Sequence, residues 1–127
     1  MKYIILIILV LLILSCSLKR TNPLDPLVSG TKDPNRVTNI EVITAGNNII
    51  NITWDEMSNI DGYYIYRSYI HNGLYDLIKD EGNISVSDYI DNDVEDISNV
   101  WYIMSAYIMV DSERLEGYRS EPTTWTQ

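Results

Sequence analysis

The chain is poor in the residues that carry most nucleophilic and acid–base chemistry. Its 127 residues include one cysteine, Cys16, and one histidine, His71. One cysteine excludes an intramolecular disulfide and a cysteine-based zinc site. A catalytic triad needs a histidine buried beside a serine, whereas His71 stands in a predicted turn beside Asn72 and Gly73. We therefore expect an exposed turn histidine, no enzymatic activity and no cofactor.

Basic side chains are also scarce. The sequence has 9 Lys and Arg against 18 Asp and Glu, which gives a net charge of −9. Without residues 1–15, which include Lys2, 8 basic and 18 acidic side chains leave a net charge of −10. Because a nucleic-acid backbone is bound through clustered Lys and Arg, the composition argues against nucleic acid as a partner. The same acidity repels anionic lipid, so charge does not hold this protein at a membrane.

The only long apolar run stands at the N-terminus. Lys2 precedes a continuous apolar stretch, residues 3–14, which is shorter than the about 20 residues that span a bilayer. The end of this run, Ile13-Leu14-Ser15-Cys16, resembles a bacterial lipobox. The resemblance implies a signal peptide over residues 1–15 and a diacylglycerol thioether on Cys16 that anchors the protein in a membrane. The alternative is an uncleaved N-terminal anchor helix.

Residues 17–36 are predicted to form an extended tether after the lipidated Cys16. The stretch is polar, has no apolar periodicity and contains Pro23, Pro26 and Pro34, which disfavour both helix and central strand. Residues 22–26 resemble a short motif that follows the lipid cysteine in many bacterial lipoproteins. Ser17 stands where many diderm bacteria use aspartate for inner-membrane retention. The resemblance therefore implies the outer membrane or the cell surface.

Residues 37–127 are predicted to form one all-β domain. Short β-rich runs alternate with turn residues, and Ile50, Ile52 and Trp54 share one face at period two. No segment has a sustained helical periodicity. The expected strands are residues 37–44, 49–54, 62–68, 75–78, 86–91, 101–110 and 118–126.

These runs resemble, in their order, a fibronectin type III domain of the bacterial kind. The segments that carry the resemblance are 37–40, 50–54, 62–68, 89–94, 102–106 and 120–122. The resemblance implies an Ig-like sandwich of about seven strands, the usual size of such a domain. It also places Val100 where the family has a corner tyrosine, with Trp101 beside it.

Two surfaces are candidates for binding a protein or a carbohydrate. In the family's topology, the loops 55–61 and 111–117 lie at the same pole, and loop clusters of this kind commonly bind partners. Their candidate contact residues are Met57, Arg114 and Leu115.

The second candidate surface is the outer face of the third strand. If Tyr63 and Ile65 face the core, Tyr64 and Tyr66 point outward beside Arg67. Exposed tyrosines with an arginine have the composition of an interface centre or a sugar-stacking surface. The alternative is cross-strand aromatic pairing that only stabilises the sheet.

The densest acidic cluster is a weaker candidate for a cation site. Its oxygen ligands would suit Ca²⁺, but it lacks the glycine and the closing glutamate of an EF-hand loop. We therefore interpret it as a charged strand edge that discourages edge pairing, and we predict no metal site. The cluster consists of Asp88, Asp91, Asp93, Glu95 and Asp96.

Taken together, these features favour a lipid-anchored protein of the bacterial cell envelope. Its domain is expected to bind protein or glycan, or to act as a spacer, and the membrane is its first partner through Cys16. The alternatives are a scaffold subunit of an envelope complex and an accessory domain of an enzyme.

Overall fold

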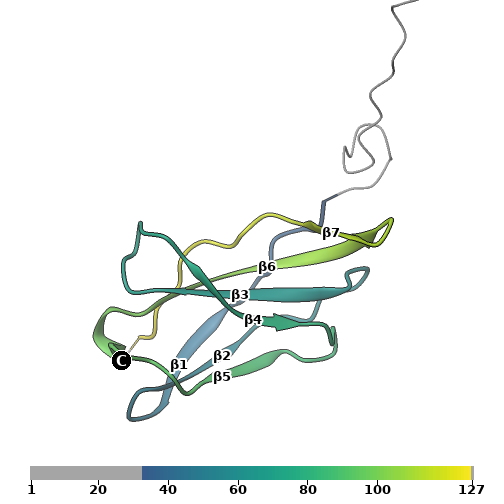
Figure 1. Cartoon of the computed structure of the whole chain (residues 1–127). Coiled ribbons are helices and arrows are strands. Elements are labelled where there is room, and N and C mark those ends of the chain that lie inside the picture. The colour runs from purple at the N-terminus through teal and green to yellow at the C-terminus, as the bar shows by residue number, and fades with distance from the viewer. Residues whose placement is uncertain (1–32, 127) are drawn as a thin grey trace, which may run out of the picture.

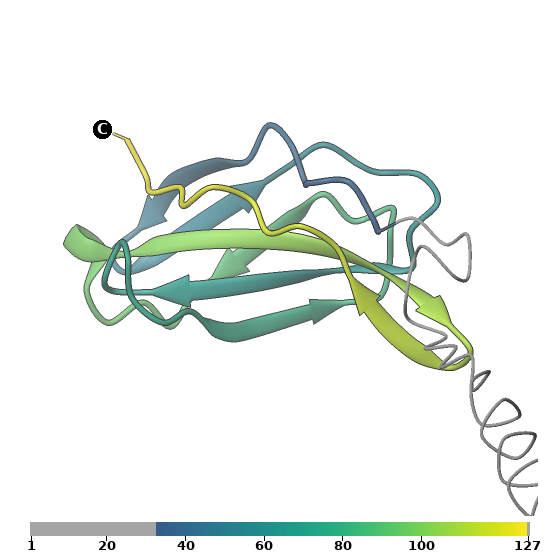
Figure 2. The ribbon, with the colours of Figure 1, turned by 90° about the horizontal axis from the view of Figure 1, so that it is seen from above.

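The computed structural model describes residues 33–126, which form two antiparallel β-sheets. In the three-stranded sheet, β2 lies between β1 and β5, and in the four-stranded sheet the order is β4, β3, β6, β7. The four-stranded sheet lies in front of the other in Figure 1, and Figure 2 shows the two sheets packed face to face. The strands are β1 Glu41–Gly46, β2 Ile49–Thr53, β3 Gly62–Ser68, β4 Asp76–Glu81, β5 Asp88–Asp91, β6 Trp101–Val110 and β7 Glu113–Glu116.

The predicted signal peptide, Cys16 and residues 17–32 of the predicted tether lie outside the described residues. From residue 33 to residue 126, no helix has the length and apolar character needed to cross a bilayer. The described chain has one short helical turn, η1 (Ile97–Asn99). Its first residues are capped by Asp96, whose carboxylate accepts a hydrogen bond from the Ser98 N–H at 2.9 Å.

The core lies between the two sheets and is filled by the inward-facing residues of the strands. Ile50 and Ile52 of β2 are fully buried, as are Tyr63 and Ile65 of β3. Trp54 packs edge-on against Tyr63, with ring centroids 5.4 Å apart. Each such side chain contributes about 1.5–3 kcal/mol when it leaves water. The predicted all-β sandwich of seven strands is thereby confirmed.

The first strand begins later than predicted. β1 starts at Glu41. Residues 37–40 precede it and are not part of a strand, although the Val37 side chain is buried in the core. Asn39 has a positive φ of 52°, which breaks the extended backbone. Asp55 holds this segment from the side, because its carboxylate accepts from Asn39 Nδ2 at 2.6 Å.

The last strand is the main error of the sequence prediction. Residues 111–117 were expected to be a loop and 118–126 a strand, whereas the structure has β7 at 113–116. Asp111 and Ser112 both have positive φ, so the chain reverses in a two-residue turn and pairs with β6 at once. Beyond β7, residues 118–126 form no strand, and they meet β6 through an isolated bridge between Tyr102 and Thr123 and through the Ser120 N–H, which donates to the Met104 carbonyl at 2.7 Å. Pro122 lacks the amide that a continuous ladder needs.

The corner before β6 is tied down by the C-terminal segment. Val100 is fully buried in the position where the family resemblance expects a tyrosine. Thr124 Oγ1 donates to the Val100 carbonyl at 2.6 Å, and Trp125 Nε1 donates to the Ile97 carbonyl. These two side chains therefore supply backbone ties that a corner tyrosine would otherwise make.

The two ends of the sandwich are distinct. Figures 1 and 2 place the first described segment and the β6–β7 turn at one end of the sandwich and the C-terminus at the opposite end. We call the first the tether end, formed by residues 33–36, the loop 55–61 and the turn 111–112. The far end is formed by the turn 69–75 and by residues 92–99.

Candidate interaction surfaces

The outer face of the four-stranded sheet carries three tyrosines. Tyr64 and Tyr66 of β3 lie on the side away from the core, and Tyr107 of β6 joins them. Tyr64 stacks on Tyr107 at a centroid distance of 4.7 Å and meets Tyr66 edge-on at 6.1 Å. Only Tyr64 is appreciably accessible, since Tyr66 is 6% exposed and Tyr107 3%.

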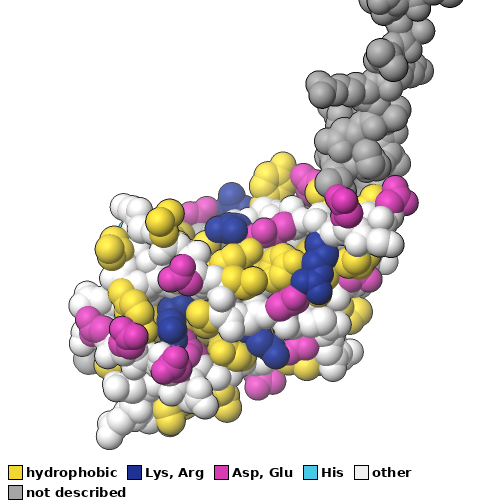
Figure 3. All heavy atoms as spheres, in the orientation of Figure 1, with side chains coloured by type: hydrophobic (Ala, Val, Ile, Leu, Met, Phe, Trp, Pro, Cys, Tyr) yellow, Lys and Arg dark blue, Asp and Glu magenta, His cyan; other side chains and the backbone are white. Residues whose placement is uncertain are grey.

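Two arginine side chains cover these rings, Arg114 of β7 and Arg119 of the segment that follows β7. The Arg114 guanidinium lies 4.7 Å from the Tyr107 centroid, donates to the Tyr64 hydroxyl at 3.2 Å and pairs with Asp80. Arg119 lies 4.1 Å from the Tyr66 centroid. Such cation–π contacts contribute about 0.5–1 kcal/mol at exposed sites. Figure 3 shows this face, where basic, acidic and hydrophobic side chains interleave.

Glu116 of β7 is the hydrogen-bonding centre of the same face. Its Oε1 accepts from the hydroxyls of Tyr66 and Ser105, at 2.9 and 2.7 Å, and from Arg119 Nε at 3.1 Å. Burial opposes the charge of Glu116, but these donors outweigh burial and lower the pKa of the carboxyl. Burial, together with the Glu116 carboxylate, raises the pKa of Tyr66 to about 12.

This face is therefore a cross-strand aromatic cluster with its polar atoms already paired. That arrangement matches the stabilising alternative that the sequence left open. Tyr66 lies under Arg119, so it does not offer the free ring that a sugar-stacking surface needs. Tyr64 and Arg114 remain partly accessible, and they lie together although the sequence assigned them to different surfaces.

Arg67 does not stand beside the outer tyrosines, contrary to the prediction. Period two puts it on the inner face with Tyr63 and Ile65, where it crosses to the other sheet. Its NH1 donates to both Asp91 oxygens, at 3.0 and 2.9 Å, and to the Asp93 carbonyl at 2.7 Å.

The Asp91 carboxylate is the buried centre of this link between the sheets. It also accepts from the Tyr102 hydroxyl at 2.8 Å, and its side chain is only 3% exposed. Burial raises the pKa of Tyr102, and the neighbouring carboxylate raises it further. Burial alone would lower the pKa of Arg67, but the bond to Asp91 outweighs it and raises the pKa.

Asp91 thus belongs to an ion pair and not to an exposed acidic edge. Its cluster partner Asp93 contributes a carbonyl to Arg67, and Asp96 caps η1. Across residues 33–126, no group of three or more His, Cys, Asp or Glu side chains is arranged to hold a metal ion.

The tether end separates the three loop residues chosen from the sequence. Met57 is half-buried against the core and its N–H donates to the Tyr63 hydroxyl at 2.8 Å. Leu115 is half-buried opposite Ile108 in the β6–β7 ladder, while Arg114 points to the outer face.

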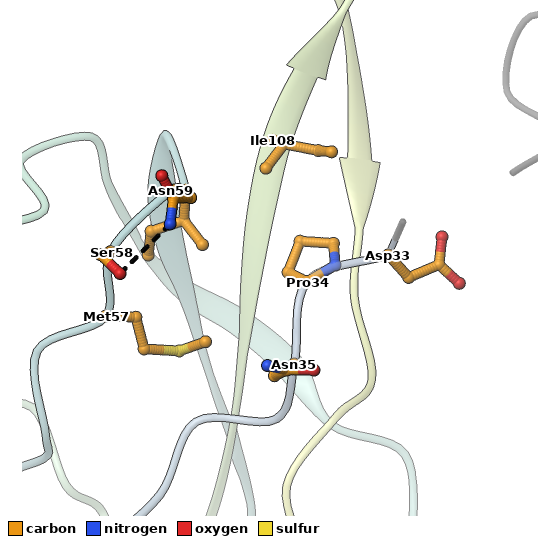
Figure 4. Close-up of a pocket in the computed structure, with 8 residues that line it drawn as sticks. Asp33, Pro34, Asn35, Met57, Ser58, Asn59 and Ile108 are labelled. Carbon is orange, nitrogen blue, oxygen red and sulfur yellow. Dashed lines mark hydrogen bonds between the residues drawn. The ribbon is translucent and has the colours of Figure 1, made fainter. Parts of the chain in front are cut away.

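A pocket of about 270 Å³ opens between Met57 and the incoming chain. In Figure 4, Met57 from the loop, Ile108 from β6 and Pro34 from the first described segment lie around one space. Its remaining lining residues are Asp33, Asn35, Ser58, Asn59 and Ile60. The pocket has one carboxylate and otherwise neutral side chains, so it offers no obvious acid–base pair.

The far end carries exposed apolar residues that the sequence reasoning did not select. Leu74 is 93% exposed and Ile70 68%, and both stand on the turn 69–75. His71 lies in this turn, where its ring contacts Trp101 at a centroid distance of 4.4 Å. The signal was present in the sequence, because two aliphatic residues flank the polar turn residues Asn72 and Gly73.

No family model matches the sequence, and no curated protein matches it. Solved structures do match. An Fn3-like protein from Clostridium thermocellum is 19% identical, with a TM-score of 0.52, over 76% of this chain and 97% of that one. A myokine is 17% identical, with a TM-score of 0.51, over 72% and 94% of the two chains. The fn3 domain of the human collagen alpha-1(XX) chain is 12% identical, with a TM-score of 0.50, over 77% and 91%.

The described domain therefore has the fold of a fibronectin type III domain, as the sequence resemblance implied. At these identities the similarity establishes the fold alone.

Proposed function

We propose that this chain is a lipid-anchored module of the bacterial cell envelope, whose domain binds a protein outside the cytoplasmic membrane without catalysing a reaction. The observation that carries the proposal is the position of the only cysteine. Cys16 ends an apolar run that is too short for a spanning helix, and one β-sandwich follows it.

A lipid on Cys16 would hold the protein durably. Two or three acyl chains are needed for stable anchoring, because each buried methylene contributes about 0.8 kcal/mol and a single chain binds reversibly. With a net charge of −10 on residues 16–127, electrostatic attraction to anionic lipid does not contribute.

The contacts of the titratable groups support a non-catalytic role. Asp91 and Glu116 are the carboxylates with the densest sets of donors, and both sets tie strands or segments together. Their neighbours Tyr102 and Tyr66 donate hydrogen bonds to these carboxylates, and burial raises the pKa of both tyrosines further above physiological pH. These are stabilising roles inside the fold.

The anchor is tested by metabolic labelling with an alkyne fatty acid, followed by fractionation of the cells. We expect the wild-type protein to carry label and to pellet with membranes. The Cys16→Ala variant should lose the label and should become soluble or accumulate as a longer precursor. Equal labelling of both proteins would refute acylation at Cys16.

The membrane is tested by separating inner and outer membranes of a diderm host on a density gradient. We expect the wild type in the outer membrane, since Ser17 follows the acylated cysteine. In hosts that read an aspartate at this position, Ser17→Asp should move the protein to the inner membrane. Inner-membrane recovery of the wild type would contradict this part of the proposal.

A further inference from the structure

The far end holds two aliphatic side chains in water on an ordered turn. We call Ile70 and Leu74 the apolar tip. Leaving a leucine or isoleucine exposed forgoes about 1.5–3 kcal/mol of burial energy. The turn is nevertheless fixed by its own hydrogen bonds, from Gly73 N–H to the Ile70 carbonyl at 2.9 Å and from the Tyr75 hydroxyl to the His71 carbonyl at 2.7 Å. A preordered tip loses little conformational entropy on binding.

Carboxylates lie on the segments next to the apolar tip. The segment 92–96 touches the turn, because the Glu95 N–H donates to the Tyr69 hydroxyl at 2.9 Å. The exposed carboxylates of this segment and of the first residue of β4 are Asp93, Glu95, Asp96 and Asp76. Arg67 is the basic side chain that reaches this region, and its charge is used by Asp91. Figure 3 shows hydrophobic and acidic side chains together at this end of the domain.

We propose that the far end is the binding surface for a partner protein that presents an apolar pocket bordered by Lys and Arg. Ile70 and Leu74 enter the pocket, and the neighbouring carboxylates face its basic border. This inference rests on the proposed function in one respect. A lipid on Cys16 would be connected to the domain through residue 33, and the first described residues lie at the end of the sandwich opposite the far end (Figure 1).

The negative charge near the apolar tip favours a basic protein partner over a second copy of the chain or an anionic membrane. A second copy docked through the same end would bring two acidic borders together, and like charges facing across an interface cost several kcal/mol. An anionic bilayer is repelled for the same reason. A carbohydrate is bound through accessible aromatic faces, whereas the tip is aliphatic and the partly buried rings beside it have partners in the domain, since Trp101 contacts His71 and Tyr69 lies under Arg67.

The test begins with the full-length protein in its own envelope. A photoreactive diazirine amino acid is placed at position 74, and in a control protein at position 43, because Ile43 is 50% exposed on the other sheet. We expect position 74 to crosslink one protein and position 43 not to crosslink it. Crosslinking mainly to lipid, mainly to a second copy, or equally from both positions would overturn the inference.

The crosslinked protein is then purified, and its affinity for the purified full-length chain is measured. Leu74→Ser or Ile70→Ser should weaken binding at least tenfold, whereas Ile43→Ser should leave it unchanged. The double change Asp93→Asn and Glu95→Gln should slow association several-fold and flatten its salt dependence. Binding that survives Leu74→Ser, or that does not depend on salt, would overturn the inference.

Failure of this inference is distinguishable from failure of the anchor. Fatty-acid labelling and fractionation of the same cells report on Cys16 alone. A labelled, membrane-bound protein without a crosslink at position 74 would refute the binding surface and leave the anchor intact. An unlabelled protein that still binds its partner through Leu74 would refute the anchor and leave the binding surface intact.

Discussion

The tether end and the far end of the sandwich are each stabilised by a different kind of contact. At the tether end, backbone lies against backbone, because a Cβ on Gly117 would come within 2.4 Å of the Pro34 carbonyl oxygen. The loop 55–61 is fixed there by Asp61, whose carboxylate accepts from the Met109 N–H at 2.6 Å. At the far end, one buried ion pair, Arg67–Asp91, joins the two sheets from inside.

This difference determines which apolar side chains are exposed to solvent at each end. Apolar residues at the tether end, such as Met57, are half-covered by the chain that enters there. The Arg67–Asp91 pair joins the sheets beneath the far end, and within the turn 69–75 it is Tyr69 that packs against the core. Ile70 and Leu74 can therefore stand in water without weakening the fold.

The largest expected loss of stability is at the far end. Asp91→Ala leaves Arg67 buried without a counter-charge and the Tyr102 hydroxyl without an acceptor, and we expect a loss of about 3–5 kcal/mol in the free energy of unfolding. Chemical denaturation followed by tryptophan fluorescence measures it. The control is Asp93→Ala, since the Asp93 carbonyl and not its carboxylate binds Arg67. A loss for Asp91→Ala as small as the control's would show that the pair does not hold this end.

The second largest expected loss of stability is at the tether end. Gly117→Ala forces its Cβ against the Pro34 backbone, and we expect a cost of about 1–3 kcal/mol from the overpacking. Gly82→Ala is the matched control, because its nearest neighbour would be the Tyr107 hydroxyl at an ordinary 3.8 Å. Thermal unfolding compares the two variants. Equal melting temperatures would mean that residues 33–36 do not press on β7.

The third expected effect is a smaller change in stability, and it concerns Glu116 of β7. The Glu116 pKa in the folded protein lies below its ordinary value of 4.5, so its contribution is complete above that pH and is lost as the pH falls below it. Stability of the wild type should therefore decrease from pH 5 to pH 3 more steeply than that of Glu116→Gln. The measurement is denaturant unfolding across that range, and parallel pH profiles would contradict the assigned contacts.

The smallest effect on stability is expected for the apolar tip. Leu74→Ser and Ile70→Ser remove side chains that are largely in water, so the free energy of unfolding should change by no more than about 0.5 kcal/mol. The same variants should abolish most of the partner binding proposed above. A large loss of stability would show that the tip packs against the domain, and would remove the reason to regard it as a binding surface.

Much of the fold was predictable from local alternation. The period-two pattern of Ile50, Ile52 and Trp54 placed β2, and the aromatic run 62–68 placed β3 with its correct bounds. The same alternation predicts the side of Arg67, since it lies two residues after Ile65 and therefore faces inward, not toward Tyr64 and Tyr66.

Other features could not be predicted from local patterns. The turn at Asp111 and Ser112 has positive φ at both residues without a glycine, so the predicted loop lacked the Asn-Gly or Asp-Gly signal of a two-residue hairpin that leads into β7. The covering of Tyr66 by Arg119 joins residues far apart in the sequence. Such contacts follow from the path of residues 117–120 over the sheet, which no periodicity encodes.

We propose that the lipid anchor is joined to the tether end of the domain and that the far end is presented away from the membrane. Cys16 is the only cysteine, so in the lipidated protein an introduced cysteine would be the only free thiol. A dye is attached to Asn59→Cys at the tether end or to Leu74→Cys at the far end, and the lipidated proteins are placed in vesicles that carry a headgroup quencher. We predict stronger quenching at position 59 than at position 74. Equal quenching at the two positions, or stronger quenching at position 74, would contradict the account.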